Sequence, residues 1–405
     1  MTTRSPARDG ADQCPGLLSP FVSADGAMVR LRVPGGRVAA ADLVEVSSLA
    51  GRFGDPDVTL TSRGSLQLRG LPSPLPRELV TAIGALRLVP SAAHDKARNV
   101  VADPTPALDD LVRALDEALL ADDALAALPG RFLLAVAALG GAVLGEPWDV
   151  AVVDEGASAR VLVDGRALVV PRADAATTVL DVARRFLAVR GGERVWNVRD
   201  LPAEDRAALL PGGSPFVVDV GSPPPAGPLG EDLVVLVPLG LLTPAMAAAL
   251  AGPAGMRVEP GPAAPLAGRG ASGALRCEPQ RASNGSSATS VETTLVVTPW
   301  RSVLVPGGAA RAAELAAAGL VVSAGSPWAV LTACAGAPAC ARTTTPTREL
   351  ARAAAPLVDP FGPPVHVIGC DRACGHPARP HTTALDPNCP DDVVRAQRRT
   401  PEEPT

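Results

Sequence analysis

Hydrophobic and polar residues alternate along the first part of the chain in a pattern that predicts a strand, a helix and a strand pair. Met28 to Val33 (MVRLRV) alternates apolar and basic residues, as in a half-buried strand, and Pro34-Gly35-Gly36 predicts the turn that ends it. Apolar residues then recur at helical spacing from Leu43 to Phe53. Val58 to Leu71 (VTLTSRGSLQLRGL) predicts two strands joined at Arg63-Gly64. With a second short helix at Leu79 to Leu88, these elements predict a βαβ-type half-module.

The same order of elements returns in the second half of the chain. Asp232 to Gly252 repeats the strand, the Pro-containing turn and the helix. Val296 to Gly307 (VVTPWRSVLVPG) repeats the strand pair, with Arg301 in the place of Arg63. A repeated series of supersecondary elements predicts a tandem duplication. Between the two repeats, strand-like runs after Arg131 and an amphipathic helix predict a separate α/β unit.

Composition narrows the class of protein. A chain of 405 residues is long enough for two or three domains, and its net charge of −5 without a Lys/Arg block argues against a nucleic-acid partner. No apolar run reaches membrane length and no apolar leader opens the chain, so we expect a cytoplasmic protein without a membrane partner. Seven cysteines, an odd number, fit a reducing compartment better than a disulfide framework.

Four of the cysteines form two close pairs that predict a metal centre. Cys334 and Cys340 lie in CAGAPAC, and Cys370 and Cys374 lie in CDRAC. Thiolates are the ligands of iron–sulfur clusters and of zinc. The gaps of five and three residues are wider than the usual zinc knuckle, and the first loop consists of small residues, which favours a bulkier [4Fe–4S] cluster. A zinc site and simply buried thiols remain the alternatives.

Several motifs, taken in chain order, resemble the nitrite/sulfite reductase family. They are LRVPGG, LTSRGSLQLRGL, RNVVADP, LPGRF and the CAGAPAC/CDRACGHP pair. The resemblance implies an α+β fold with tandem-duplicated ferredoxin-like half-domains and two α/β nitrite/sulfite reductase-type iron–sulfur domains. The expected segments are a flexible N-terminus (1–15), half-domain 1 (16–90), α/β domain 1 (91–220), a linker and half-domain 2 (221–310) with a disordered insertion (253–290), the cluster-binding domain 2 (311–380) and a disordered tail (381–405).

The resemblance also implies a set of anion-handling residues. Arg30 and Arg98 fall on two arginines of the family, and Arg131 falls on the first of a pair of lysines, so these three are the candidate catalytic residues. The second lysine falls on Leu133. Replacing a lysine by leucine removes a charge from the wall of a cationic cup, which argues against a reductase of sulfite or nitrite.

The remaining matched positions suggest a pocket for a larger ligand. The resemblance places Arg63 and Gln67 beside a bound macrocycle, and Arg69 lies on the same face of the predicted strand. Arg32 and Arg301 are further candidates for this pocket. Guanidinium groups bind carboxylates through paired hydrogen bonds, and a tetrapyrrole precursor carries several carboxylates.

Within the family, VVTPWRSVLVPG and the length of the chain resemble the precorrin-3B synthase branch. That resemblance implies a monooxygenase of aerobic cobalamin biosynthesis, which hydroxylates precorrin-3A with O2 and with electrons from an external reductase or ferredoxin. It also implies a non-haem iron, for which His94 and His376 are the candidate ligands or proton-transfer residues. The alternatives are a sirohaem-dependent sulfite or nitrite reductase and a non-catalytic iron–sulfur electron-transfer protein.

Overall fold

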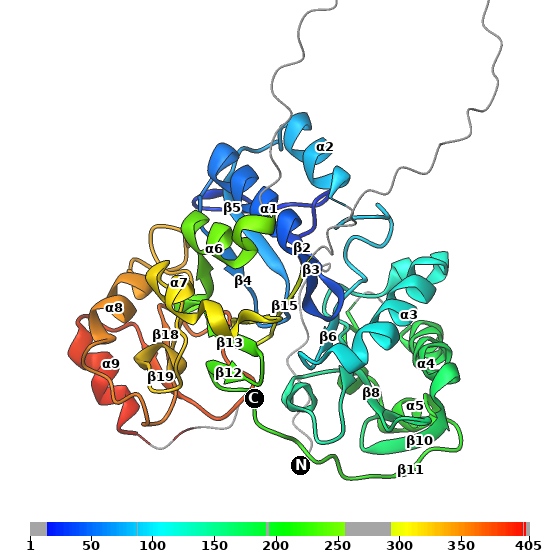
Figure 1. The fold of residues 1–405 in the computed structure, drawn as a ribbon. Helices are drawn as coiled ribbons and strands as arrows, with labels where there is room; N and C mark the ends of the chain where they lie inside the picture. Colours follow the sequence, from blue (N-terminus) through cyan, green and yellow to red (C-terminus); the bar gives the residue numbers. More distant parts are fainter. Residues whose placement is uncertain (1–13, 87, 192–193, 256–292, 400, 402–405) are drawn as a thin grey trace, which may run out of the picture.

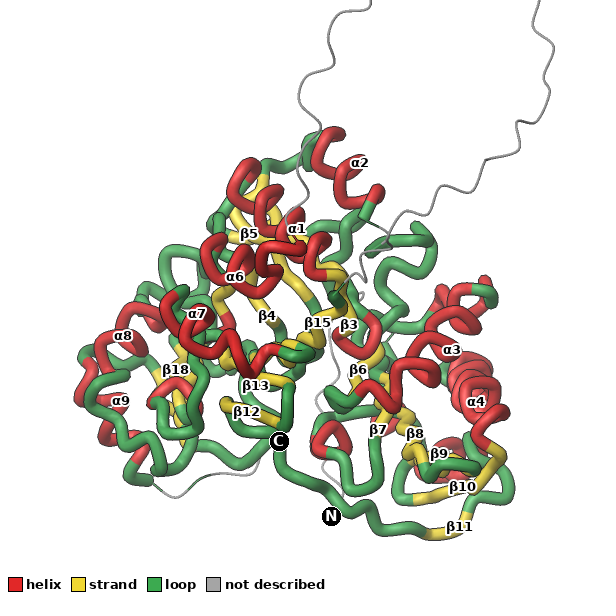
Figure 2. Tube along the Cα trace, viewed as in Figure 1, coloured by secondary structure: helices red, strands yellow, loops and turns green. Residues whose placement is uncertain are grey.

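The computed structural model describes residues 14–86, 88–191, 194–255, 293–399 and 401 (Figure 1). Nearly all of the expected flexible N-terminus and of the expected insertion at 253–290 lies outside these residues. The described chain has a mixed α+β fold, with helices packed on the faces of several sheets (Figure 2). None of the described helices is both long and apolar enough to cross a membrane.

The first half-domain forms as the alternating pattern predicts. In β2 (Gly26–Leu31), Ala27, Val29 and Leu31 are buried in the same apolar core as helix α1 (Ala40–Phe53), and the residues between them face the other way. The strands β1, β2, β5 and β4 lie side by side in that order and are antiparallel. The other elements of this half are β1 (Phe21–Ser23), β3 (Arg37–Ala39), β4 (Val58–Leu60), β5 (Leu66–Leu71) and α2 (Arg77–Ala85).

The second half-domain repeats the first, as the predicted duplication requires. Its turn Pro238–Gly240 matches Pro34–Gly36, because Leu239 (φ 54°) and Gly35 (φ 58°) both have positive φ. In each turn the third residue donates its backbone N–H to the carbonyl three residues earlier, at 2.8 Å. The elements are β12 (Gly227–Leu229), β13 (Asp232–Leu236), β14 (Leu241–Leu242), α6 (Pro244–Gly255), β15 (Thr294–Val297), β16 (Ser302–Val305) and α7 (Ala312–Ala317).

The two half-domains exchange strands. Strand β3 of the first half pairs with β15 of the second, and β14 of the second half pairs with β4 of the first. The turns that precede these strands also interlock, since Gly36 lies against the carbonyl oxygen of Val297 and Gly240 against that of Leu60. A Cβ atom on Gly36 would come within 1.9 Å of that oxygen, so a side chain is excluded there. Helices α1 and α6 pack together over the joined sheets, and the halves share one apolar core (Figure 1).

The structure shifts the predicted alignment of the repeat by one residue. The hairpin residue with positive φ is Gly64 in the first half (62°) and Arg301 in the second (59°). Each of these residues donates its backbone N–H to the carbonyl of a threonine three residues earlier. Arg301 therefore corresponds to Gly64, and Trp300 corresponds to Arg63. The prediction that Arg301 takes the place of Arg63 is wrong, because an arginine beside the turn aligns the two motifs without fixing which residue makes the turn.

The middle of the chain forms the predicted α/β unit. Its sheet has the order β11-β10-β9-β8-β7-β6, in which β6, β7 and β8 are parallel and the remaining pairs are antiparallel. Helices α3 and α4 pack together and close its apolar core. The elements are β6 (Val100–Ala102), α3 (Asp109–Leu120), β7 (Leu134–Ala137), β8 (Val150–Asp154), β9 (Ser158–Val163), β10 (Arg166–Pro171), α4 (Ala175–Val189), α5 (Ala203–Ala208) and β11 (Ser214–Pro215).

The C-terminal unit carries the four paired cysteines on a parallel sheet, β17-β18-β19. Its elements are β17 (Leu331–Ala333), α8 (Thr347–Ala354), β18 (Val365–Ile368), β19 (Thr382–Leu385) and α9 (Pro390–Gln397). The prediction of a disordered tail at 381–405 is wrong for β19 and α9. The segment is rich in polar residues, so its amphipathic helix was not predicted. In this helix Val393 and Ala396, three residues apart, are buried.

Candidate functional site: two cysteine loops and a cationic sheet face

The parallel sheet brings the two cysteine pairs together. Strands β17 and β18 are neighbours, and Ala333 lies opposite Val367. Cys334 follows β17 directly, and Cys370 comes two residues after β18 ends. Because the carboxyl ends of parallel strands lie at one edge of a sheet, both cysteine loops leave from the same place. The topology thus explains how cysteines some thirty residues apart can serve one centre.

The electrostatics of Cys374 place all four thiols in one neighbourhood. Burial raises the pKa of the Cys374 thiol, Arg372 opposes this, and the negative charges of Cys334, Cys370 and Cys340 raise it further. Within the described part of the chain, no three His, Cys, Asp or Glu side chains are grouped tightly enough to hold a single metal ion. Thiolates are soft donors that suit both iron–sulfur clusters and zinc, so these four cysteines are a donor set for either group.

The first cysteine loop is held from within. Gly336 has φ 62°, and a Cβ atom there would lie 2.3 Å from the hydroxyl oxygen of Thr347. The Gly336 carbonyl accepts a hydrogen bond from the backbone N–H of Cys340 at 2.8 Å. Thr347 donates its hydroxyl to the carbonyl of Cys334 at 2.9 Å, and its oxygen lies 3.6 Å from the Cys334 sulfur. The loop therefore depends on a residue without a side chain at position 336.

Four of the predicted site residues, two from the catalytic set and two from the pocket, form one cationic group. Arg30 on β2 donates to the side-chain oxygen of Gln67 on β5 at 3.5 Å, and Arg63 donates to the backbone carbonyl of Arg131 at 2.9 Å. Burial lowers the pKa of Arg63 to about 10, and the charges of Arg30 and Arg131 also lower it. Arg131 itself is exposed and stacks 5.0 Å above the ring of Trp196. The guanidinium groups of Arg30, Arg63 and Arg131 thus concentrate positive charge beside the polar face of the first sheet.

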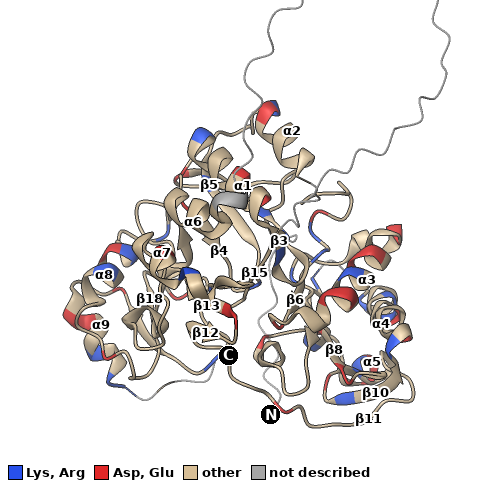
Figure 3. Ribbon diagram, in the orientation of Figure 1, with Lys and Arg blue, Asp and Glu red and all other residues tan. Residues whose placement is uncertain are grey.

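Arg69 and Arg301, which the sequence also suggested for the pocket, lie instead on the cysteine loops. Arg69 donates to the carbonyl of Ala339, the residue before Cys340, at 3.0 Å. Arg301 donates to the carbonyl of Gly375, the residue after Cys374, at 2.6 Å. On the outer helices α8 and α9 of this unit, acidic and basic residues are interspersed (Figure 3).

Arg98 and Arg32 are engaged in contacts within the scaffold. Arg98 forms a two-bond ion pair with Asp116 (2.8 and 2.7 Å) and donates to the carbonyl of Leu88 at 2.9 Å. Arg32 donates to the side chain of Asn99 and to the carbonyl of Pro15. Both side chains are buried. The structure therefore separates Arg98 from the cationic group that Arg30 and Arg131 belong to.

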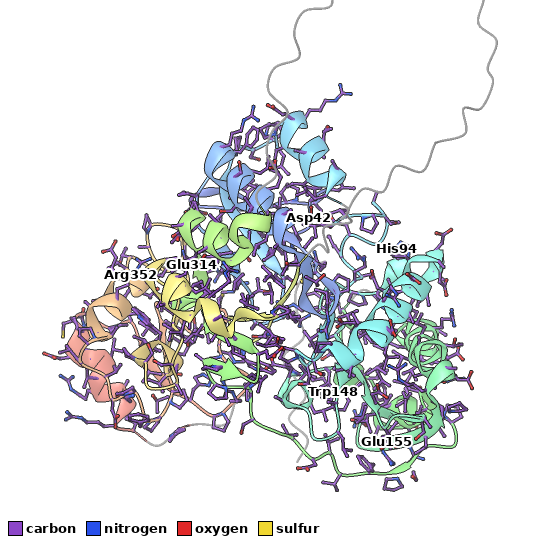
Figure 4. All side chains as sticks on the ribbon, in the orientation of Figure 1. Asp42, His94, Trp148, Glu155, Glu314 and Arg352 are labelled. Carbon is purple, nitrogen blue, oxygen red and sulfur yellow. The ribbon has the colours of Figure 1, made fainter. Side chains whose placement is uncertain are left out.

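His94 is buried in the segment between α2 and β6. One ring nitrogen lies 2.8 Å from the hydroxyl of Ser91 and the other 3.0 Å from the carbonyl of Asp122. Figure 4 shows His94 beside α3, across the molecule from Arg352 on α8. With both nitrogens engaged, His94 has no atom left for an iron ligand in this arrangement, so the interpretation of His94 as a candidate ligand loses its basis.

The other three histidines gather beside Cys374. His376 is exposed and stacks on His381 with ring centroids 6.0 Å apart, and His366 meets the edge of the same ring at 6.0 Å. His366 is bonded to the hydroxyl of Thr332 and to the carbonyl of Cys374, and burial lowers its pKa to about 3. His376 thus stays a candidate, and only the fold shows that His366 and His381 join it.

The sequence did not predict a role for Glu146, a buried carboxyl group where the α/β unit meets the second half-domain. Glu146 lies in the loop between β7 and β8, and its side chain accepts a hydrogen bond from the indole N–H of Trp300 at 2.9 Å. The two line a cavity of about 90 Å³ together with Ser62, Arg301 and Arg379. Such a volume holds a few water molecules rather than a tetrapyrrole. No motif marks Glu146, because its partners come from distant segments.

Leu133 does not line the cationic group. Its side chain is 1% exposed and packs in an apolar cluster with Val143 and Leu144. Its backbone N–H donates to the buried carboxylate of Asp149 at 2.8 Å. A lysine at this position would have its charge in an apolar environment, so the leucine agrees with its surroundings.

Comparison with known proteins agrees with this fold. Residues 22–74 match the family model of the nitrite/sulfite reductase ferredoxin-like half domain. The chain thus contains a segment similar to that half domain. Among curated relatives, it is similar to a precorrin-3B synthase of Sinorhizobium sp., with 34% identity over 113 residues, which are 25% of this chain and 24% of that protein.

Two further proteins are similar to the chain. The hemoprotein beta-component of the NADPH sulfite reductase of Acidithiobacillus ferrooxidans is 38% identical over 80 residues, which are 20% of this chain and 14% of that protein. The chain thus matches at most about a quarter of the length of these curated relatives. The structure of Mycobacterium tuberculosis NirA superimposes with a TM-score of 0.57 at 19% identity, covering 86% of this chain and 69% of NirA, which is a likeness of fold.

Proposed function

We propose that the chain is an oxidoreductase of the precorrin-3B synthase type, which hydroxylates precorrin-3A with O2 and external electrons. One observation carries the proposal: a single polar sheet face links the cysteine loops to the cationic group. On this face Arg69 reaches the loop of Cys340, and Gln67, two residues earlier on β5, bonds Arg30 of the cationic group. A ligand with several carboxylates could lie along this face and contact both ends.

The residues divide into two tasks. Cys334, Cys340, Cys370 and Cys374 would hold a [4Fe–4S] cluster, which supplies one-electron transfer when it is bound. Arg30, Arg63 and Arg131 would bind and orient the carboxylates of the substrate, and their fixed positions would hold the macrocycle for reaction.

The hydroxylation balances when an external donor provides two electrons and two protons. One oxygen atom of O2 enters a C–H bond of the precorrin, and the other leaves as water. His376 is a candidate for moving a proton, because it is exposed beside Cys374 and an imidazole ring can accept a proton at one nitrogen and donate one from the other.

A sirohaem-dependent sulfite reductase is the second candidate, because the Acidithiobacillus subunit is similar to part of the chain. Two observations favour the oxygenase. The second lysine of the family is a leucine buried in the core, and the remaining cations are arginines spread along a sheet face. A small inorganic anion needs a dense cup of charge, whereas a polycarboxylate can use separated guanidinium groups.

The test is to reconstitute the purified protein with iron and sulfide, add precorrin-3A, O2 and a reductant, and analyse the tetrapyrrole by mass spectrometry. We expect a product with one additional oxygen atom, formed only when O2 and reductant are both present. Arg63→Gln should raise the KM for precorrin, while Arg160→Gln, whose guanidinium pairs with Glu155 in the α/β sheet, should leave it unchanged. Binding of sirohaem with reduction of sulfite, and no oxygenated product, would establish the reductase instead.

A further inference from the structure

The second cysteine of each pair is next to a backbone carbonyl group that accepts a hydrogen bond from an arginine outside the loop. For the first pair this carbonyl belongs to Ala339, which precedes Cys340. Arg69 donates to it at 3.0 Å, and the hydroxyl of Ser23 donates to it at 2.9 Å. Both donors come from the first half-domain, more than 250 residues earlier in the chain. The tip of the cysteine loop is therefore fixed by another part of the fold.

The Arg69 guanidinium is itself held rigidly. The carboxylate of Asp25 accepts two bonds from it, at 2.8 and 3.1 Å, and the sulfur of Met28 lies 3.0 Å from a third nitrogen. Arg69 is 6% exposed. A guanidinium that is paired with a carboxylate on one edge has few orientations left, so it presents the remaining N–H groups in a fixed direction.

For the second pair the carbonyl belongs to Gly375, which follows Cys374. Arg301 donates to it at 2.6 Å from the turn before β16 in the second half-domain. The stem of Arg301 packs on Gly240, where a Cβ atom would lie 2.7 Å from the arginine Cδ. Arg301 also has φ 59°, a conformation that glycine adopts more easily than any other residue. The chain keeps an arginine at a position where the backbone favours glycine, which indicates that the side chain has a task there.

The duplication does not explain the two contacts. Arg301 corresponds to Gly64 in the first half, and the position that corresponds to Arg69 in the second half is Pro306. The two arginines therefore occupy different places in the repeat, yet each reaches a carbonyl beside a cysteine.

We propose that Arg69 and Arg301 are positioning residues for the metal centre, one from each half-domain. The strand ends of β17 and β18 fix Cys334 and Cys370, and the two arginines fix the loops of Cys340 and Cys374. The cysteine loops are thus shaped before the cluster binds. This inference rests on the proposed cluster, and it assigns the retention of that cluster to residues that are not ligands.

The variants can separate positioning from folding. Arg301→Gly removes the guanidinium but places glycine at a positive φ, so the apo-protein should unfold at the same temperature as the wild type or at a higher one. Arg69→Lys keeps the charge but loses the planar guanidinium group, whose N–H groups bond both the carboxylate of Asp25 and the carbonyl of Ala339. Arg37→Lys is the control, because Arg37 also pairs with a carboxylate, Asp109, and donates to carbonyl groups, but far from the cysteines.

Each protein is reconstituted with iron and sulfide, its iron content is measured, and the decay of the cluster absorption is followed in the presence of a chelator. We expect Arg301→Gly and Arg69→Lys to lose the cluster about ten times faster than the wild type, the effect of losing one hydrogen bond from a charged donor. Arg37→Lys should behave as the wild type.

The outcomes distinguish the two proposals. If the wild type takes up iron and sulfide and both variants retain them equally well, the positioning role is refuted while the cluster stands. If Arg37→Lys loses the cluster as fast as the other two, the effect is a general one of replacing a hydrogen-bonded arginine, and the positioning role is also refuted. If the wild type takes up no cluster at all, the proposed function fails first.

Discussion

Replacing Glu146 with glutamine tests whether the carboxyl beside Trp300 keeps its proton near neutral pH. The side chain is 8% exposed, and the indole N–H of Trp300 donates to its Oε1 atom at 2.9 Å. Burial raises the pKa of Glu146 from 4.5 to about 7, against the opposing effects of this hydrogen bond and of Arg379, Arg63 and Arg301. Glutamine keeps an oxygen for Trp300 and cannot ionise.

The size of the effect follows from the two pKa values. One pKa unit corresponds to about 1.4 kcal/mol, so the interval from 4.5 in the unfolded chain to about 7 in the fold is worth about 3 kcal/mol. The folded state binds the proton more tightly than the unfolded state. The contribution of Glu146 to stability is therefore complete below pH 4.5 and is lost as the pH rises through about 7.

The assay is denaturant unfolding of the wild type and of Glu146→Gln at a series of pH values from 4.5 to 8. The free energy of unfolding of the variant, relative to the wild type, should rise by about 3 kcal/mol across this range. Glu117→Gln, on the exposed face of α3, is the control for a charge change without burial. A difference between wild type and Glu146→Gln that stays constant from pH 4.5 to 8 would refute the reasoning.

Three further substitutions test the site and its scaffold. Cys370→Ser should abolish the visible absorption and iron content of the reconstituted cluster. Cys389→Ser should retain both, because Cys389 lies at the start of α9 and serine suits a helix N-cap. Leu133→Lys should lower the free energy of unfolding by about 3–5 kcal/mol in a urea titration by burying an uncompensated charge, whereas Leu133→Met should cost less than about 1.5 kcal/mol. Gly336→Ala should cost about 1–3 kcal/mol in the same titration, because φ is positive and the new Cβ meets Thr347; a variant as stable as the wild type would contradict the loop geometry.

Much of the fold could be predicted from the local pattern of apolar and polar residues. The alternation in β2, the helical spacing in α1 and the repeat after residue 230 depend on neighbouring residues, and each was visible in the sequence. The exchange of β3 and β14 between the half-domains could not be predicted from the sequence. Strand pairing is decided by which edges meet in space, and very short strands such as Leu241–Leu242 carry no signal of their partner.

For the candidate site too, some features could be predicted from the sequence and others could not. The cysteine spacing and the arginines of β2 and β5 could be found because motifs mark them. The partners of those arginines could not, since an arginine motif does not reveal a carboxylate such as Asp116, which holds Arg98. The same limit explains why Arg69 looked like a pocket residue when its contacts are Asp25 and Ala339.

The exchanged strands give the cysteine loops a rigid reference. Gly36 and Gly240 each press against a carbonyl of the opposite half, so the two half-domains cannot slide past each other without breaking both contacts. Arg69 and Arg301 stand on opposite halves of this locked pair and hold one cysteine loop each. A shift between the halves would therefore move Cys340 relative to Cys374. It follows that the shape of the proposed metal centre is set by the duplicated scaffold as much as by the loops that carry the thiolates.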